Sequence, residues 1–179
     1  MKSTLYWCSW AAGIALVLSF VSHVAALLGR QGPLGAYAIW LHFGIFVVWL
    51  PTVLAGNRLA RNARRKDAWK VMLRGCPDWM RYMIFVFFGY ALVNFLIFMA
   101  AVNQAKQNGF TPLVARGFSG HWMAFYSAAM AVLYSASRVW DQDDKSRCPN
   151  GHVADVLAKY CDQCGLPISQ FGGGSPLQH

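Results

Sequence analysis

Four long stretches of the chain are rich in apolar side chains and contain no Asp, Glu, Lys or Arg. They cover residues 3–29, 31–57, 82–105 and 117–137. A helix needs about 20 apolar residues to cross the roughly 30 Å hydrocarbon core of a bilayer. The pattern therefore predicts an all-α membrane protein. Its four transmembrane helices are expected at about residues 5–28, 35–56, 82–102 and 118–137, within a domain of residues 1–140.

Composition supports this class, because 56% of the residues are hydrophobic and only 13% are charged. A cleaved signal sequence is the alternative for the first stretch. That stretch is longer than the roughly 7–15 apolar residues of a signal sequence, and only Lys2 provides a charged start. We therefore expect a membrane helix there.

Cationic residues are unevenly distributed over the segments that join these stretches. Eight of the 16 Lys and Arg residues lie in residues 57–81, and 13 of the 16 fall on the side that also holds both termini. Short loops rich in Lys and Arg stay in the cytoplasm. We therefore expect a multi-pass protein of the cytoplasmic (inner) membrane with both termini in the cytoplasm. The net charge of +9 is then a signal of topology, and no nucleic-acid partner is expected.

The central loop, residues 57–81, mixes apolar residues with its cations. It can form a short amphipathic helix on the membrane surface, a solvated basic loop, or a docking site for an acidic partner. In the first case its cations would meet anionic lipid headgroups. The residues that we expect to contact headgroups or a partner are Arg58, Arg61, Arg64, Arg65, Lys66, Lys70 and Arg74.

A polar linker at residues 141–147 separates the last apolar stretch from a Cys- and His-containing segment. Cys148 and His152 form its first half, and Cys161 and Cys164 form its second. Three thiolates and one imidazole can complete a tetrahedral zinc shell. So short a segment has no core of its own without a metal, so a structural Zn²⁺ is the favoured interpretation over free cysteines in a disordered tail. Residues 166–179 are expected to form a flexible tail.

Residues 148–165 resemble a short zinc ribbon of the kind attached to many bacterial proteins, whereas the four apolar stretches resemble no family that can be named. Such ribbons often carry Cys-x-x-Cys in both halves, but the first half here is Cys-x-x-x-His. His152 therefore stands in place of the second cysteine of such a half. The resemblance implies a docking or scaffold module.

Polar side chains within the apolar stretches form the second group of candidates. Histidine is rare in a bilayer, and His23, His42 and His121 all fall in the outer leaflet of the predicted topology, with Asn94 on the third helix. These side chains can act as interhelical hydrogen-bonding groups, as a site for haem, a metal or a quinone, or as a proton path. The first interpretation is favoured.

No catalytic triad or phosphate-binding loop is recognisable, and none of the seven Asp and Glu residues lies within a predicted span. The sequence therefore favours a non-enzymatic protein. The first hypothesis is a membrane adaptor or assembly factor that presents a cytoplasmic zinc ribbon and a basic loop to a protein partner. The alternative is a redox or transport protein that holds a cofactor at the outer-leaflet histidines.

Overall fold

The computed structural model describes residues 1–30, 32, 34–61, 63–102, 111–140, 148–154 and 158–168. Five α-helices are present in this part of the chain: α1 (Lys2–Leu27), α2 (Trp40–Leu59), α3 (Ala68–Met72), α4 (Asp78–Val102) and α5 (Pro112–Val139). Short 3-10 helices precede α2 at Gly35–Ile39 and α3 at Arg65–Asp67. The predicted linker at 141–147 and residues 169–179 of the predicted tail lie outside the described residues.

Three of the described helical segments are long and apolar enough to cross a membrane: Lys2–Leu27, Gly35–Leu59 and Asp78–Ala101. Each overlaps one of the stretches expected to span. The fourth expected span, residues 118–137, lies within α5, which does not reach the same hydropathy. An all-α protein with three strongly apolar helices is therefore what the structure establishes.

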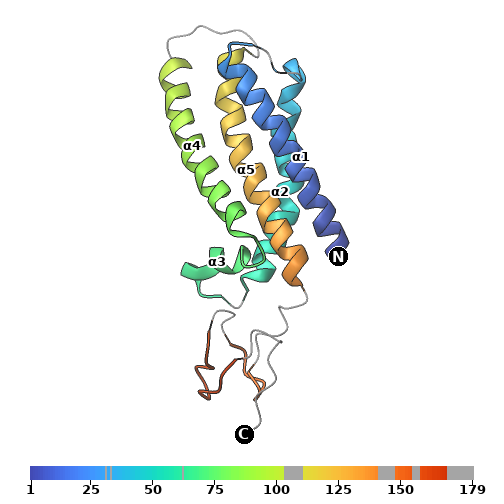
Figure 1. Ribbon diagram of the computed structural model, residues 1–179, viewed down its shortest axis with the longest axis vertical. Helices are drawn as coiled ribbons and strands as arrows, with labels where there is room; N and C mark the ends of the chain where they lie inside the picture. Colours follow the sequence, from blue (N-terminus) through green and yellow to red (C-terminus); the bar gives the residue numbers. More distant parts are fainter. Residues whose placement is uncertain are drawn as a thin grey trace.

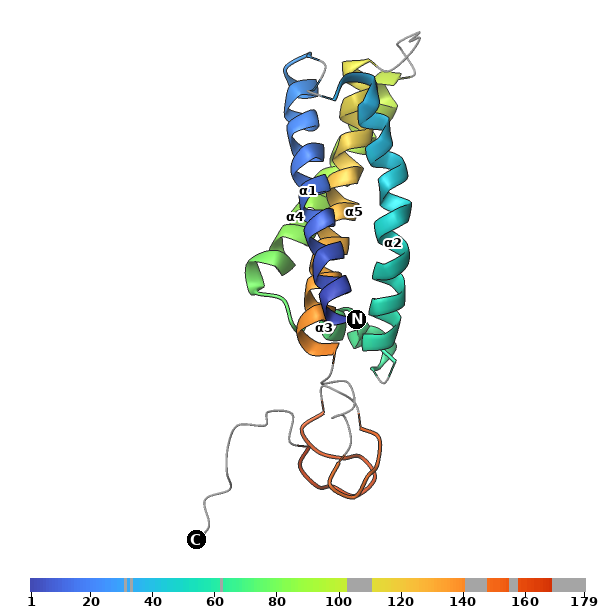
Figure 2. The ribbon, with the colours of Figure 1, turned by 90° about the vertical axis from the view of Figure 1, so that its right-hand side faces the viewer.

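The position of α5 explains why it is less apolar than the other long helices. It lies between α4 and α1 in Figure 1 and between α1 and α2 in the turned view of Figure 2. A helix surrounded by other helices does not need lipophilic side chains on all faces. The fully buried positions of α5 include Ser119, Ser127 and Ser135, as well as Trp122 and Tyr126.

The buried serines of α5 are compatible with an apolar core because their hydroxyl groups have partners. Ser119 donates to the carbonyl of Ala115 at 2.6 Å, and Ser127 donates to that of Ala124 at 2.9 Å. Ser135 instead accepts a hydrogen bond of 3.0 Å from the backbone N–H of Gly75. Small, hydrogen-bonded side chains let neighbouring backbones approach α5 closely.

The segment between α2 and α4 is docked against α5 through its second half. Val71, Leu73 and Cys76 are buried, and the Cys76 thiol donates to the carbonyl of Ala131 at 3.0 Å. A Cβ atom at Gly75 would lie 2.8 Å from the carbonyl oxygen of Ser135, so only glycine fits there without a shift. This part of the predicted basic loop is therefore a packed element of the bundle rather than a freely solvated connector.

Candidate metal centre and polar clusters of the bundle

The first half of the metal-ligand segment is a tight turn that places Cys148 next to His152. The N–H of Gly151 donates to the carbonyl of Cys148 at 2.8 Å, and the N–H of Cys148 donates to that of His152 at 2.9 Å. Gly151 has a φ of +80°, which L side chains rarely adopt. The Asn-Gly pair of the sequence thus builds the turn that presents both side chains on one side.

The second half repeats this arrangement around Cys161 and Cys164. Gly165 adopts a φ of +71° and donates to the carbonyl of Cys161 at 2.8 Å. The N–H of Cys161 donates to the carbonyl of Leu166 at 2.8 Å, and the N–H of Ile168 donates to the carbonyl of Lys159 at 2.9 Å. Residues 166–168 are therefore part of this unit, and the predicted flexible tail begins too early at 166. We call residues 148–168 the knuckle unit.

The four predicted ligands converge in the knuckle unit. The Sγ atoms of Cys148, Cys161 and Cys164 and a ring nitrogen of His152 all lie within 4.8 Å of one another. Sγ of Cys148 is 3.6 Å from Sγ of Cys164, and Sγ of Cys161 is 3.8 Å from Nδ1 of His152. A tetrahedral Zn²⁺ with Zn–S of about 2.3 Å and Zn–N of about 2.0 Å requires ligand separations of roughly 3.5–3.8 Å. The residues therefore fit a metal ion such as zinc.

Burial and neighbouring groups shift the pKa values of Cys161 and Cys164 in opposite directions. Burial by itself raises the pKa of Cys161, but the backbone N–H groups of Gln163 and Cys164 and the side chains of Cys164 and His152 lower it to about 6. A backbone hydrogen bond from Leu166 lowers the pKa of Cys164, but burial and the neighbouring thiols of Cys161 and Cys148 raise it overall. The Cys161 thiol is thus stabilised as a thiolate, whereas the neighbouring Cys164 thiol resists ionisation. A shared cation would relieve this conflict.

The cluster also supplies two of the four buried residues in the core of the knuckle unit. Cys148 and Cys161 are buried together with Ala154 and Ile168, and Cys164 packs against them. Four protein ligands fill a tetrahedral shell, so no coordination position remains for water or substrate. This donor set could hold a metal ion such as zinc.

The three histidines of the apolar stretches divide into two separate clusters. His23 of α1 is buried and bonded at both ring nitrogens, with Nδ1 2.8 Å from Oγ of Ser119 on α5 and Nε2 2.5 Å from the hydroxyl oxygen of Tyr90 on α4. Since the Ser119 hydroxyl donates to Ala115, it accepts from Nδ1–H of His23, and Nε2 then accepts from Tyr90. Both ring nitrogens are used, so His23 joins three helices as the interhelical hydrogen-bonding group that the sequence favoured.

His42 of α2 and His121 of α5 form the second cluster, with ring centroids 5.7 Å apart. Nδ1 of His42 accepts a hydrogen bond of 3.2 Å from the indole N–H of Trp122. The ring of Phe118 lies 5.5 Å from each imidazole. The structure therefore brings together two of the three histidines, and it places His23 in a different network.

Asn94 lies on α4, four residues after Tyr90 of the first cluster. It is buried, donates to the carbonyl of Arg116 at 2.8 Å and accepts from Nε of the Arg116 side chain at 3.1 Å. These reciprocal bonds join α4 to the beginning of α5. Asn94 is therefore a packing residue with satisfied hydrogen bonds.

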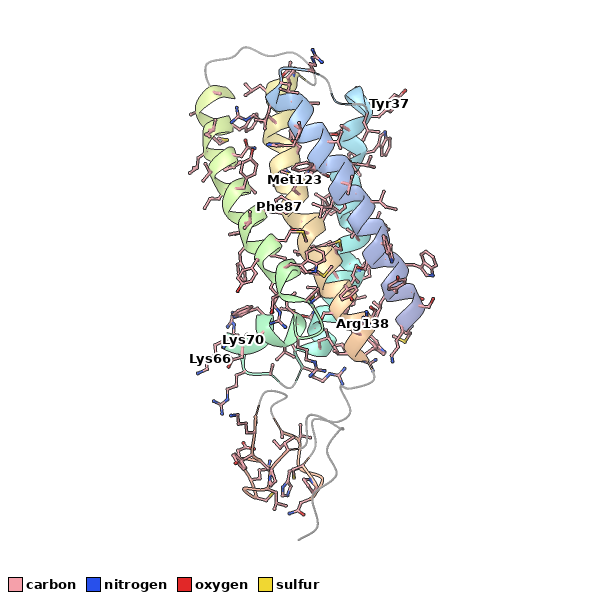
Figure 3. All side chains as sticks on the ribbon, viewed as in Figure 1. Tyr37, Lys66, Lys70, Phe87, Met123 and Arg138 are labelled. Atoms are coloured by element: carbon pink, nitrogen blue, oxygen red, sulfur yellow. The ribbon has the colours of Figure 1, made fainter. Side chains whose placement is uncertain are left out.

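The cations named as headgroup or partner contacts occupy different environments. The guanidinium of Arg58 lies over the ring of Trp140 at 4.1 Å, and Lys70 pairs with Asp67 at 2.7 Å. Arg74 is half-buried within the docked segment, and its carbonyl accepts a hydrogen bond from Arg81. The exposed members are Arg61, Arg64, Arg65, Lys66 and Lys70. Figure 3 shows Lys66 and Lys70 at the same end of the bundle as Arg138, with Tyr37 at the opposite end.

The sequence did not reveal Tyr90 and Trp122 as partners of the histidines. Each lies on a different helix from its histidine, 67 and 80 residues away along the chain. Aromatic residues are common in all four apolar stretches, so nothing local marks these two. Searches against protein-family models, curated proteins and solved structures find no match to this chain.

Proposed function

We propose that this chain is an integral membrane adaptor that presents a zinc-bound knuckle unit and a basic surface to a protein partner at the cytoplasmic face. The convergence of Cys148, His152, Cys161 and Cys164 carries this proposal. A closed shell of four protein ligands stabilises a small folded surface and leaves no position for catalysis. Zinc is the metal best suited to three thiolates and one imidazole in a tetrahedral arrangement.

The membrane domain of the proposal has four spans, with α5 as the fourth. Its 28 residues correspond to a length of about 40 Å, which exceeds the thickness of the hydrocarbon core. The apolar helices α1, α2 and α4 pack around it, so its serines face protein. In this arrangement α5 crosses the bilayer without facing lipid on most of its surface.

Charge supports a cytoplasmic location for the end of the bundle that carries α3. The segment that joins α2 to α3 carries the exposed cations Arg61, Arg64, Arg65 and Lys66, and the exposed rings of Trp69 and Trp79 follow in α3 and at the start of α4. Aromatic rings next to cations are typical of the lipid–water interface, where the cations meet anionic headgroups. The knuckle unit lies beyond the same end in Figure 1, and reduced cysteines suit the cytoplasm.

Fusions to reporters test this orientation. Alkaline phosphatase, which is active only outside the cytoplasm, is expected to be inactive when fused after Arg138 and active when fused at Tyr37. A green fluorescent protein, which does not fold after export in unfolded form, is expected to show the reverse pattern. The reason is the excess of cations at one end, 13 of 16. Phosphatase activity after Arg138 would contradict the proposed topology.

Photo-crosslinking tests the adaptor function itself. Tyr160 is 65% exposed on the knuckle unit, whereas Tyr37 is 75% exposed at the opposite end of the bundle. With p-benzoylphenylalanine at position 160, we expect one discrete crosslinked protein in intact cells. The same group at position 37 serves as the control and should not give that product.

The crosslink should also depend on the metal centre. In the variant with Cys161→Ser and Cys164→Ser, the product from position 160 is expected to disappear, because the surface that holds the partner is no longer folded. A product of unchanged yield in this variant would show that the folded unit is not the binding surface. Absence of any discrete product from position 160 would count against the adaptor function.

A further inference from the structure

The His42 ring has an N–H group for which no described residue provides a hydrogen-bond acceptor. Trp122 is a donor only, so Nδ1 of His42 must be the acceptor of their 3.2 Å hydrogen bond. A neutral imidazole with a lone pair on Nδ1 carries its proton on Nε2. Within the described residues the only hydrogen bond of the His42 side chain is the one from Trp122. An unpaired N–H in an apolar environment costs free energy. A ligand that accepts a hydrogen bond from Nε2–H would remove this cost.

The surroundings of this N–H are aromatic and open toward the outside of the bundle. His42 and His121 are both partly exposed, and their ring centroids lie 5.7 Å apart. The ring of Phe118 is 5.5 Å from both imidazoles, and Phe46, which is 66% exposed, lies 6.0 Å from His42. In a membrane these exposed rings face acyl chains. A ligand would therefore reach the site from the lipid phase.

The assigned tautomer limits the class of ligand. A metal ion or a haem iron needs a ring nitrogen with a free lone pair, but Nδ1 of His42 is occupied by Trp122 and Nε2 carries the proton. A hydrogen-bond acceptor such as a carbonyl oxygen matches this donor. A flat ring that carries this carbonyl matches the surrounding aromatic rings by offset or edge-to-face contact.

We propose that His42 and His121 form a binding site for the headgroup of a lipid-soluble quinone. Nε2–H of His42 donates to a carbonyl oxygen of the headgroup, Phe118 and Phe46 contact its ring, and His121 provides a second imidazole beside it. Trp122 is a positioning residue because it fixes the tautomer of His42. This site is independent of the adaptor function, since it lies on α2 and α5 within the bundle and shares no residue with the metal centre.

Photoaffinity labelling of the full-length protein in lipid nanodiscs tests the site. An azido-substituted ubiquinone analogue is expected to label peptides of α2 and α5 around His42 and His121, and decylubiquinone should compete. The variant His42→Phe should reduce labelling about tenfold, the effect of losing one hydrogen bond of about 1.4 kcal/mol. His121→Phe, which removes the second imidazole beside the headgroup, should also reduce labelling. His23→Gln, which alters the other histidine network, is the matched control and should retain labelling.

A second measurement keeps the proposal falsifiable if His42→Phe does not fold. In protein labelled with ¹⁵N-histidine, the His42 ring should carry its proton on Nε2, and decylubiquinone should shift that resonance but not those of His23. The proposal is overturned by a protonated Nδ1 at His42, by labelling spread evenly over the helices, or by equal labelling of His121→Phe and wild type. A second equivalent of zinc that His42→Phe abolishes would also overturn it, in favour of a metal site.

Discussion

Replacing Cys161 and Cys164 with serine is expected to abolish metal binding and to unfold residues 148–168 while the helices remain intact. The buried residues of the knuckle unit include ligands Cys148 and Cys161, so little apolar area remains to stabilise it without the ion. Zinc binding contributes about 10–16 kcal/mol in isolated zinc-finger peptides, and most of this free energy stabilises the fold. Elemental analysis of the purified protein should fall from about one zinc per chain to none.

Limited proteolysis reports the structural part of this prediction. In the double variant, cleavage should appear within residues 148–168, while fragments that contain α1 to α5 stay protected and membrane-inserted. Cys8→Ser is the matched control, because Cys8 is a half-buried cysteine of α1 outside the cluster. Equal zinc content in the double variant and the control would place the metal elsewhere.

Trp122→Ala is expected to lower the free energy of unfolding of the bundle by about 3–5 kcal/mol, as large-to-small changes of buried tryptophans do. The side chain is 0% exposed on the central helix, packs on Phe118 at 6.2 Å between ring centroids and donates to His42. The change therefore leaves both a cavity and an imidazole without its donor. Reversible unfolding in mixed detergent micelles, followed by circular dichroism, measures the difference.

Trp10→Ala is the comparison that isolates burial from the loss of an indole. Trp10 of α1 is 56% exposed on the outside of the bundle. Its removal takes away contact with lipid or detergent and leaves the helix contacts in place, so the free energy of unfolding should change by less than about 1 kcal/mol. A loss as large as that of Trp122→Ala would mean that the loss of an indole, rather than its burial, accounts for the effect.

The metal centre was predictable from sequence because its determinants are local. All four ligands lie within 17 residues, from Cys148 to Cys164, and glycines at the turns permit the required backbone conformations. Spacing alone therefore indicates which side chains converge. The same locality explains why three apolar helices were identified from runs without charged residues.

The docking of the loop could not be predicted, because it depends on pairs that are far apart in sequence. Gly75 bonds to Ser135 across 60 residues, and Cys76 bonds to Ala131 across 55. The apolar residues of this loop were compatible with an amphipathic helix on the membrane surface, whereas Val71 is buried in the protein. Similarly, the predicted depth of the histidines in the membrane does not determine which two of them meet. That depends on how each helix is rotated about its axis and on which helices are neighbours.

The hydropathy of α5 illustrates a more general limit. An apolar run indicates contact with lipid, whereas a central helix is defined by contact with protein. Ser119, Ser127 and Ser135 lower the hydropathy of this helix because they are polar, and they are tolerated because they are buried against its neighbours. Charge-free length detected the segment, but only the structure reveals that it is the core.

The central place of α5 has a consequence for biosynthesis. Chains are made from the N-terminus, so α1, α2 and α4 leave the ribosome before the helix against which each of them packs. Until α5 follows, these three have few contacts with one another and His23 lacks its Ser119 partner. The bundle can close only after α5 has been translated, and the metal ligands follow α5 in the sequence. A ribosome stalled before Pro112 would therefore carry inserted but unassembled helices, open to capture by membrane quality control.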